Sequence, residues 1–180
     1  MPTQPLLMDI AGGAGQPLQL LSERFAVLAT GATTDGAYSL FAWTLASGGG
    51  WPPHLHRHED EAVVVLEGAV TVTWAGASHP APVGAYCAIP RGTLHAVTNP
   101  GPRIARLLLL VSPGGLRELL LEELGDMALL RDGAGVRGTP SLVSRRLAAA
   151  AEKYGTEFPA IPRLPWNTPA SDRLAGGEGD

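Results

Sequence analysis

The 180-residue sequence has little of several features that define large classes of protein. It has one cysteine, Cys87, so it cannot form an internal disulfide, and this agrees with a reducing, cytoplasmic location. No apolar run approaches the roughly 18 residues that a membrane-spanning helix needs. The net charge of −4 offers no basic field to a nucleic-acid backbone. We therefore expect a protein that binds neither membranes nor nucleic acids.

Aromatic and charged residues are also scarce, at 6% and 17% of the chain, whereas hydrophobic residues make up 45%. In a chain of this length, that balance is typical of one globular domain with a substantial core. The 23 glycines and 16 prolines are spread along the chain rather than gathered in repeats. They predict many short elements joined by tight turns.

Short β-rich runs separated by Gly and Pro extend from about residue 25 to residue 111. Val70, Val72 and Trp74 alternate with threonines, which is the period of a strand with one buried face. Many short strands at regular spacing predict a mainly β fold, a single antiparallel β-barrel or jelly roll, which also limits exposed sheet edges. The expected strands are 25–30, 38–45, 61–68, 69–76, 85–90, 94–99 and 103–111.

After Val111 the pattern changes from strand to helix. A first helix would begin at Ser112-Pro113, and a second would run from Thr139-Pro140 to just before Gly155. The apolar stripe of the first helix would consist of Leu116, Leu119, Leu120 and Leu124. We therefore expect four parts: an N-terminal arm or edge strand (1–24), the β-barrel (25–112), two C-terminal helices packed on the barrel (113–158) and a Pro- and Gly-rich tail (159–180).

Three histidines and three acidic residues lie in one short stretch, WPPHLHRHEDEA, at residues 51–62. His54 and His56 are two apart, so both imidazoles would project from one face of a strand. Glu61 lies at the start of the next strand, and a tight turn containing Gly would deliver His95 from the other half of the barrel. Three imidazoles and one carboxylate that converge inside a barrel can hold a divalent first-row ion and leave coordination positions open.

The spacing of these residues resembles the two sequence motifs of the cupin superfamily. The first motif comprises Gly48, His54, His56, Glu61 and Gly68, and the second comprises Gly84, Pro90, Gly92, His95 and Asn99. The resemblance implies a cupin fold and a metal site whose ligands are His54, His56, Glu61 and His95. The cofactor would be one divalent first-row transition ion (Fe, Mn, Ni, Co, Cu or Zn), because imidazole and carboxylate ligands accept several ions.

Beyond the metal motifs, the chain resembles small single-domain cupins of the quercetin 2,3-dioxygenase-like type. The resemblance covers about residues 35–160 and includes PPHLHRHEDEAVVVLEG, the Pro-Gly-Gly after the barrel, and RRLAAAAEKYGTEF. It implies a dioxygenase in which Glu61 is both a metal ligand and the general base that takes a proton from an enol or phenol. The alternatives are a non-redox metal-dependent isomerase, cyclase or lyase and, less favoured, a small-molecule-binding module without catalysis.

Residues beside the motifs have other expected places. We expect His58 at the rim of the site or behind its ligands, Glu59 and Asp60 in a solvated turn, and His79 in a solvated loop. Strand-borne apolar side chains would line the barrel, which favours an apolar or aromatic small-molecule substrate. The candidates for this lining are Trp43, Trp51, Trp74, Tyr86 and Leu107.

The remaining expectations concern cations and partners. No cluster of Arg or Lys is evident inside the barrel, although Arg91, Arg103 or Arg106 would change this if one of them pointed inward. Dioxygen would be a second substrate of the dioxygenase alternative. Exposed barrel edges favour a homodimer in which the N-terminal strand or the tail crosses to the partner.

Overall fold

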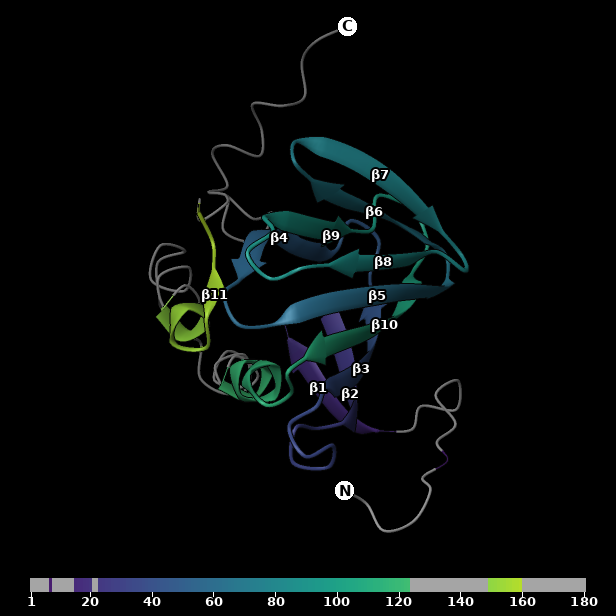
Figure 1. Cartoon of the computed structure of the whole chain (residues 1–180). Coiled ribbons are helices and arrows are strands. Elements are labelled where there is room, and N and C mark those ends of the chain that lie inside the picture. The colour runs from purple at the N-terminus through teal and green to yellow at the C-terminus, as the bar shows by residue number, and fades with distance from the viewer. Residues whose placement is uncertain (1–6, 8–14, 21–22, 124–148, 160–180) are drawn as a thin grey trace, which may run out of the picture.

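The structure is a computed structural model that describes residues 7, 15–20, 23–123 and 149–159. Within these residues, strands form two antiparallel sheets that pack face to face as a sandwich (Figure 1). The expected mainly β, antiparallel jelly-roll class is confirmed. In the described part of the chain, no helix is long and apolar enough to cross a membrane.

One sheet has six strands and the other has five. The six-stranded sheet consists, in spatial order, of β1 (Gln16–Leu20), β2 (Glu23–Ala29), β3 (Ser39–Leu45), β10 (Ala105–Ser112), β5 (Asp60–Glu67) and β8 (Tyr86–Ile89). The five-stranded sheet consists of β11 (Thr156–Glu157), β4 (Gly50–His56), β9 (His95–Thr98), β6 (Ala69–Trp74) and β7 (Ala77–Pro82).

The hydrophobic core lies between the two sheets, because successive side chains of a strand point to opposite faces. In β3, for example, every second residue from Ser39 to Leu45 is buried, and β10 shows the same alternation opposite it. The largest fully buried apolar side chains are Phe41, Leu45, Leu107, Leu109, Leu120, Leu121, Val63, Val65, Val70 and Val72. Both sheets and a helical segment therefore contribute to one core.

The strand β7 was not among the expected strands. It contains Pro80 and Pro82, and proline cannot donate a ladder hydrogen bond. The structure places β7 at the edge of its sheet, paired only with β6 among the described strands. An edge strand tolerates proline because its outer N–H groups have no ladder partner to lose.

Two helical segments, 116–123 and 149–153, lie together at one end of the sandwich (Figure 1). They contact each other through Glu123, whose Oε2 accepts hydrogen bonds from Lys153 Nζ (2.9 Å) and Tyr154 Oη (2.7 Å). The second segment ends before Gly155, as predicted, and its expected start at Thr139-Pro140 lies outside the described residues.

The predicted start of the first helix was wrong, and its apolar stripe was right only in part: Leu120 is buried and Leu116 half-buried, Leu119 is exposed, and Leu124 lies outside the described residues. Ser112 still belongs to β10, and its Oγ donates a hydrogen bond to the Ala37 carbonyl oxygen (2.8 Å). The buried face of the segment carries Arg117 and Leu120 together with Leu121, whereas Leu119 is 47% exposed. A polar contact of Arg117, described below, decides this orientation, and the leucine spacing could not reveal it.

Gly50, at the start of β4, should tolerate no side chain. Its φ is 134°, and an added Cβ would overlap the carbonyl oxygen of Val97 on β9. Backbone strain and overpacking together should make Gly50→Ala lower the free energy of unfolding by about 2–5 kcal/mol in urea denaturation. Gly48→Ala is the matched control: its φ is 70° and nothing lies within 4 Å of the added Cβ, so only the strain of about 1 kcal/mol applies. Equal losses would contradict this account.

Candidate metal centre

The structure brings the four expected ligand residues together between the sheets. His54 and His56 come from β4, Glu61 from β5 and His95 from β9. One nitrogen or oxygen atom from each lies within 4.8 Å of the others, and no more than 4% of any of the four residues is exposed. His54 and His95 are direct partners in the β4–β9 ladder, and their ring centroids are 4.3 Å apart.

An irregularity in β4 allows both Trp51 and His54 to face the interior. These residues are three apart, so a regular strand would place them on opposite faces. The register of β4 against β9 shifts between them, at Pro52 and Pro53, which lack the N–H groups that a regular ladder uses. From His54 to His56 the alternation is regular, and both rings are buried on the same face.

Backbone carbonyl groups orient two of the imidazole rings. Nδ1 of His54 lies 2.8 Å from the Pro52 carbonyl oxygen, and Nδ1 of His95 lies 2.9 Å from the Thr93 carbonyl oxygen. Because a carbonyl oxygen only accepts, Nδ1 carries the proton in both rings and Nε2 keeps its free lone pair. This is the arrangement of histidines that ligate a metal through Nε2.

Two segments distant in the sequence hold His56. Thr156 in β11 pairs with it, and Thr156 Oγ1 lies 3.1 Å from His56 Nδ1. In the turn before β9, Gly92 has a φ of 78°, and its N–H donates to the His56 carbonyl oxygen at 2.7 Å. That turn leads directly to His95, so it connects the backbone positions of two of the four residues. The turn at Gly92 was expected from the sequence, whereas no sequence pattern indicated the contact with Thr156.

A further residue that the sequence analysis did not identify, Arg117, reaches the cluster from helical segment 116–123. It is 3% exposed, and its Nη2 lies 2.6 Å from His56 Nε2 and 3.1 Å from Glu61 Oε2. Nη2 also lies 3.2 Å from His56 Nδ1, so the guanidinium lies against the His56 ring while it donates a hydrogen bond to the Glu61 carboxylate. One sequence pattern could have indicated this position. Leu120 and Leu121 follow Arg117 by three and four residues, so all three residues share one face of a helix.

Glu59, expected in a solvated turn, is instead 2% exposed, so that prediction was wrong. Its Oε1 accepts a hydrogen bond from the backbone N–H of Arg117 at 3.0 Å, and its Oε2 lies 3.6 Å from Arg117 Nε. The two residues are 58 positions apart in the chain, so no local pattern indicates the contact. The neighbouring Asp60 does lie at the surface, half exposed and paired with Arg91.

Burial and nearby charges set the ionisation of the cluster. Burial, reinforced by the positive charge of Arg117, lowers the pKa of His56 to about 4. Burial and the two neighbouring rings lower the pKa of His54 well below its usual value. Burial opposes the ionisation of Glu61, but its contacts with the neighbouring histidines and Arg117 outweigh burial and hold its pKa well below the usual range. Neutral imidazoles and an ionised carboxylate are the protonation states that metal ligation requires.

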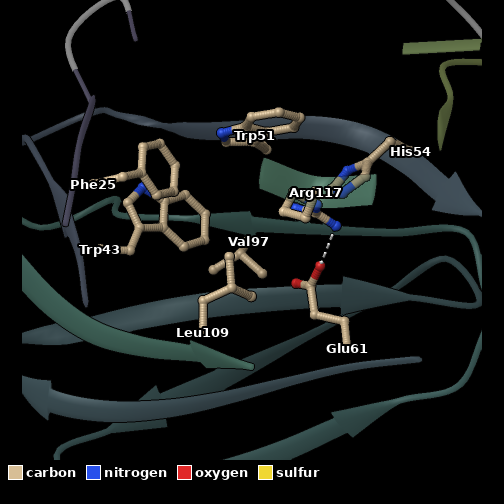
Figure 2. A pocket seen from close by; sticks show the side chains of 8 residues that line it. All are labelled: Phe25, Trp43, Trp51, His54, Glu61, Val97, Leu109 and Arg117. Atoms are coloured by element: carbon tan, nitrogen blue, oxygen red, sulfur yellow. Dashed lines mark hydrogen bonds and ion pairs between the residues drawn. The ribbon is translucent and has the colours of Figure 1, made fainter. Parts of the chain in front are cut away.

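A pocket connects this cluster to an apolar wall (Figure 2). Its polar end carries His54, Glu61 and Arg117, with the guanidinium 5.8 Å from the centroid of a tryptophan ring. On the other side Phe25 and Trp43 stack with ring centroids 5.4 Å apart. The full lining is Phe25, Trp43, Trp51, His54, Glu61, Val97, Leu109 and Arg117.

The lining differs in part from the residues expected from the sequence. Trp43 and Trp51 do line the pocket. Tyr86 does not, because β8 is an edge strand and this residue is 68% exposed on it. Trp74 stacks instead on His79, with ring centroids 3.5 Å apart, so that histidine is half-buried rather than solvated.

The other histidine and arginine side chains considered from the sequence lie outside the cluster. His58 is exposed and lies against Gly155, where an added Cβ would meet its ring. The three strand-associated arginines, Arg91, Arg103 and Arg106, are all exposed. The cation that does point inward, Arg117, comes from the helical segment.

The donor set fits a divalent metal ion. Nε2 of His95 is buried and has no hydrogen-bond partner within the described residues, which is costly for a polar atom unless something else binds it. Three imidazole nitrogens and an ionised carboxylate at short range form an N₃O set that divalent first-row ions accept. One contact has to change for an ion to bind through all four residues, because Arg117 Nη2 lies within the cluster, 2.6 Å from His56 Nε2.

Similarity to known proteins agrees with this picture. Residues 41–111 match the model of the Cupin domain family. The structure is similar to that of KdgF from a Halomonas species, with 20% identity, a TM-score of 0.50, and coverage of 57% of this chain and 90% of that one. At this identity the likeness shows the fold alone. No curated protein matches the chain.

Two further structures have lower TM-scores. One is a sugar phosphate isomerase of the cupin superfamily from Silicibacter pomeroyi, at 24% identity and a TM-score of 0.45, where the match covers 50% of this chain and only 59% of that chain. The other is the polyketide cyclase RemF from Streptomyces resistomycificus, at 21% identity and a TM-score of 0.46, with coverage of 51% and 66%. The domain match, both sequence motifs and the antiparallel sandwich agree that residues 41–111 form a cupin domain.

Proposed function

We propose that the protein is a metal-dependent dioxygenase of the quercetinase-like monocupin type that acts on a small apolar or aromatic enol or phenol. The observation that carries this proposal is the convergence of His54, His56, Glu61 and His95 at the polar end of an aromatic pocket. A redox-capable divalent ion held by these residues would supply Lewis acidity and reactivity toward dioxygen.

The pocket residues indicate how such a substrate would be held. Phe25, Trp43 and Trp51 form an apolar wall beside the cluster, which favours an apolar or aromatic ligand over a charged one. The substrate hydroxyl would then face the polar end, where the Glu61 carboxylate can accept its proton. Because the pKa of Glu61 lies well below its usual value, this carboxylate is a weak base. An enol or phenol, whose hydroxyl is more acidic than that of an alcohol, therefore suits it best.

Oxygen uptake tests the proposal. Protein loaded separately with Fe(II), Mn(II), Co(II), Ni(II) or Cu(II) should consume dioxygen when it is mixed with members of a panel of phenols and enols. Glu61→Gln should lower the turnover rate by about 10²–10⁴-fold, because it removes both a ligand charge and the proton acceptor. Metal-stripped protein is the control. Turnover of a panel member in the absence of dioxygen would contradict the dioxygenase and support a non-redox isomerase, cyclase or lyase.

Two parts of this proposal rest on the sequence and the sheet edges. A cytoplasmic location follows from the single cysteine, Cys87. A homodimer follows from the sheet edges that remain unpaired among the described strands.

A further inference from the structure

Arg117 is a buried cation placed inside the proposed metal site by a segment outside the sandwich. Only 3% of it is exposed, so its charge must be balanced by protein groups. The nearby carboxylates are Glu61, whose Oε2 lies 3.1 Å from Nη2, and Glu59, whose Oε2 lies 3.6 Å from Nε. Figure 2 shows the guanidinium directed at Glu61.

The contact with His56 excludes a metal ion on the same atom. Arg117 Nη2 lies 2.6 Å from His56 Nε2 and 3.1 Å from Glu61 Oε2, so it occupies space beside two of the proposed ligand atoms. An ion bound to these atoms would need that space and would also bring a second positive charge against the guanidinium. His56 can therefore bind Arg117 or a metal ion, but not both at once.

The protein already contains a place to which the guanidinium can withdraw. Arg117 Nε is buried and donates no hydrogen bond among the described residues. The Glu59 carboxylate faces it and is anchored by the backbone N–H of Arg117 at 3.0 Å. A side-chain rotation toward Glu59, whose Oε2 lies 3.6 Å from Arg117 Nε, would give Nε a carboxylate acceptor and move Nη2 away from His56 Nε2 and Glu61.

We propose that Arg117 and a divalent metal ion compete for His56 and Glu61, so that Arg117 neutralises the metal-free site and sets its metal affinity. This inference rests on the proposed function in that it takes the four cupin motif residues as the metal ligands. It adds a residue to the site that lies outside both motifs. Binding of the ion moves the guanidinium from the ligands to Glu59.

Zinc titration, followed by calorimetry or by competition with a chelator, tests the competition without any enzyme activity. The informative variant is the double substitution Arg117→Met with Glu59→Gln. Arg117→Met alone would leave the Glu59 carboxylate unpaired, and this extra negative charge would attract any cation. The double variant removes one charge of each sign, and the amide oxygen of the introduced glutamine can still accept the hydrogen bond from the backbone N–H of residue 117. Arg117→Leu combined with Glu59→Gln is the second variant, should methionine impair folding.

We expect the double variant to bind Zn²⁺ about tenfold to a hundredfold more tightly than the wild type. The affinity rises because the ion no longer has to displace the charged Arg117 guanidinium from its hydrogen bonds. Equal affinities, or weaker binding by the double variant, would overturn the competition while leaving the metal site intact. Absence of Zn²⁺ binding in both proteins would overturn the competition and the proposed metal-dependent function together.

Discussion

His95→Ala is expected to weaken Zn²⁺ binding at least about a hundredfold, so that the purified variant retains almost no metal in elemental analysis. His95 is 2% exposed, its ring is oriented by the Thr93 carbonyl oxygen, and its Nε2 has no hydrogen-bond partner among the described residues. Removal of the ring therefore takes away a preoriented ligand, and a water molecule in its place would bind the ion less tightly. The fold should persist, because alanine fits a buried strand position.

The matched control for this experiment is His58→Ala. His58 belongs to the same stretch as two of the proposed ligands, but it is exposed and lies against Gly155. We expect this variant to keep the metal content of the wild type. His56→Ala should behave like His95→Ala. Metal retained at the wild-type level in both of these variants would refute the ligand assignment.

Glu59→Ala should lower the free energy of unfolding of the metal-free protein by about 3–5 kcal/mol, measured by urea denaturation. The substitution leaves the buried Arg117 guanidinium with one carboxylate neighbour instead of two. It also leaves the backbone N–H of Arg117, which donates to Glu59 Oε1 at 3.0 Å, without its acceptor. Both affected groups, the guanidinium and the backbone N–H of Arg117, are buried, so water cannot replace the lost contacts. The helical segment 116–123 should therefore be held less firmly against the sandwich, although Leu120 and Leu121 still pack in the core.

Asp60→Ala provides the control, because it removes the same charge from the next residue. The Asp60 carboxylate is 49% exposed and pairs with the half-exposed Arg91, and surface pairs of this kind contribute little. Stability close to that of the wild type is expected. If both substitutions lowered the free energy of unfolding equally, burial of the Glu59–Arg117 pair would not explain the loss of stability.

The motif residues could be placed from the sequence because their geometry is local. His54 and His56 share a face through strand periodicity alone, and His95 follows a glycine turn by three residues. Asn99, the last residue of the second motif, secures a turn, because its Nδ2 donates to the carbonyl oxygens of Ala46 (3.1 Å) and Arg103 (2.7 Å). Each of these inferences needs only the conformation of a few consecutive residues.

Inferences that needed register or long-range packing failed. Tyr86 was expected to line the pocket but is exposed, because the edge position of β8 and its register against β5 determine which side chains face inward. Glu59 was expected in solvent, yet a helical segment covers it. In both cases the residue type and its neighbours in the sequence are compatible with either environment.

The sequence by itself determined the mainly β class, the two cupin motifs and the four residues that meet inside the sandwich. These depend on period-two alternation, turn chemistry and spacing, all of which act over short stretches of chain. Only the tertiary structure decided that Thr156 orients His56 and that the Arg117–Glu59 pair enters the site. These contacts join residues 100 and 58 positions apart, and they form only because β11 and the helical segment 116–123 pack against the sandwich.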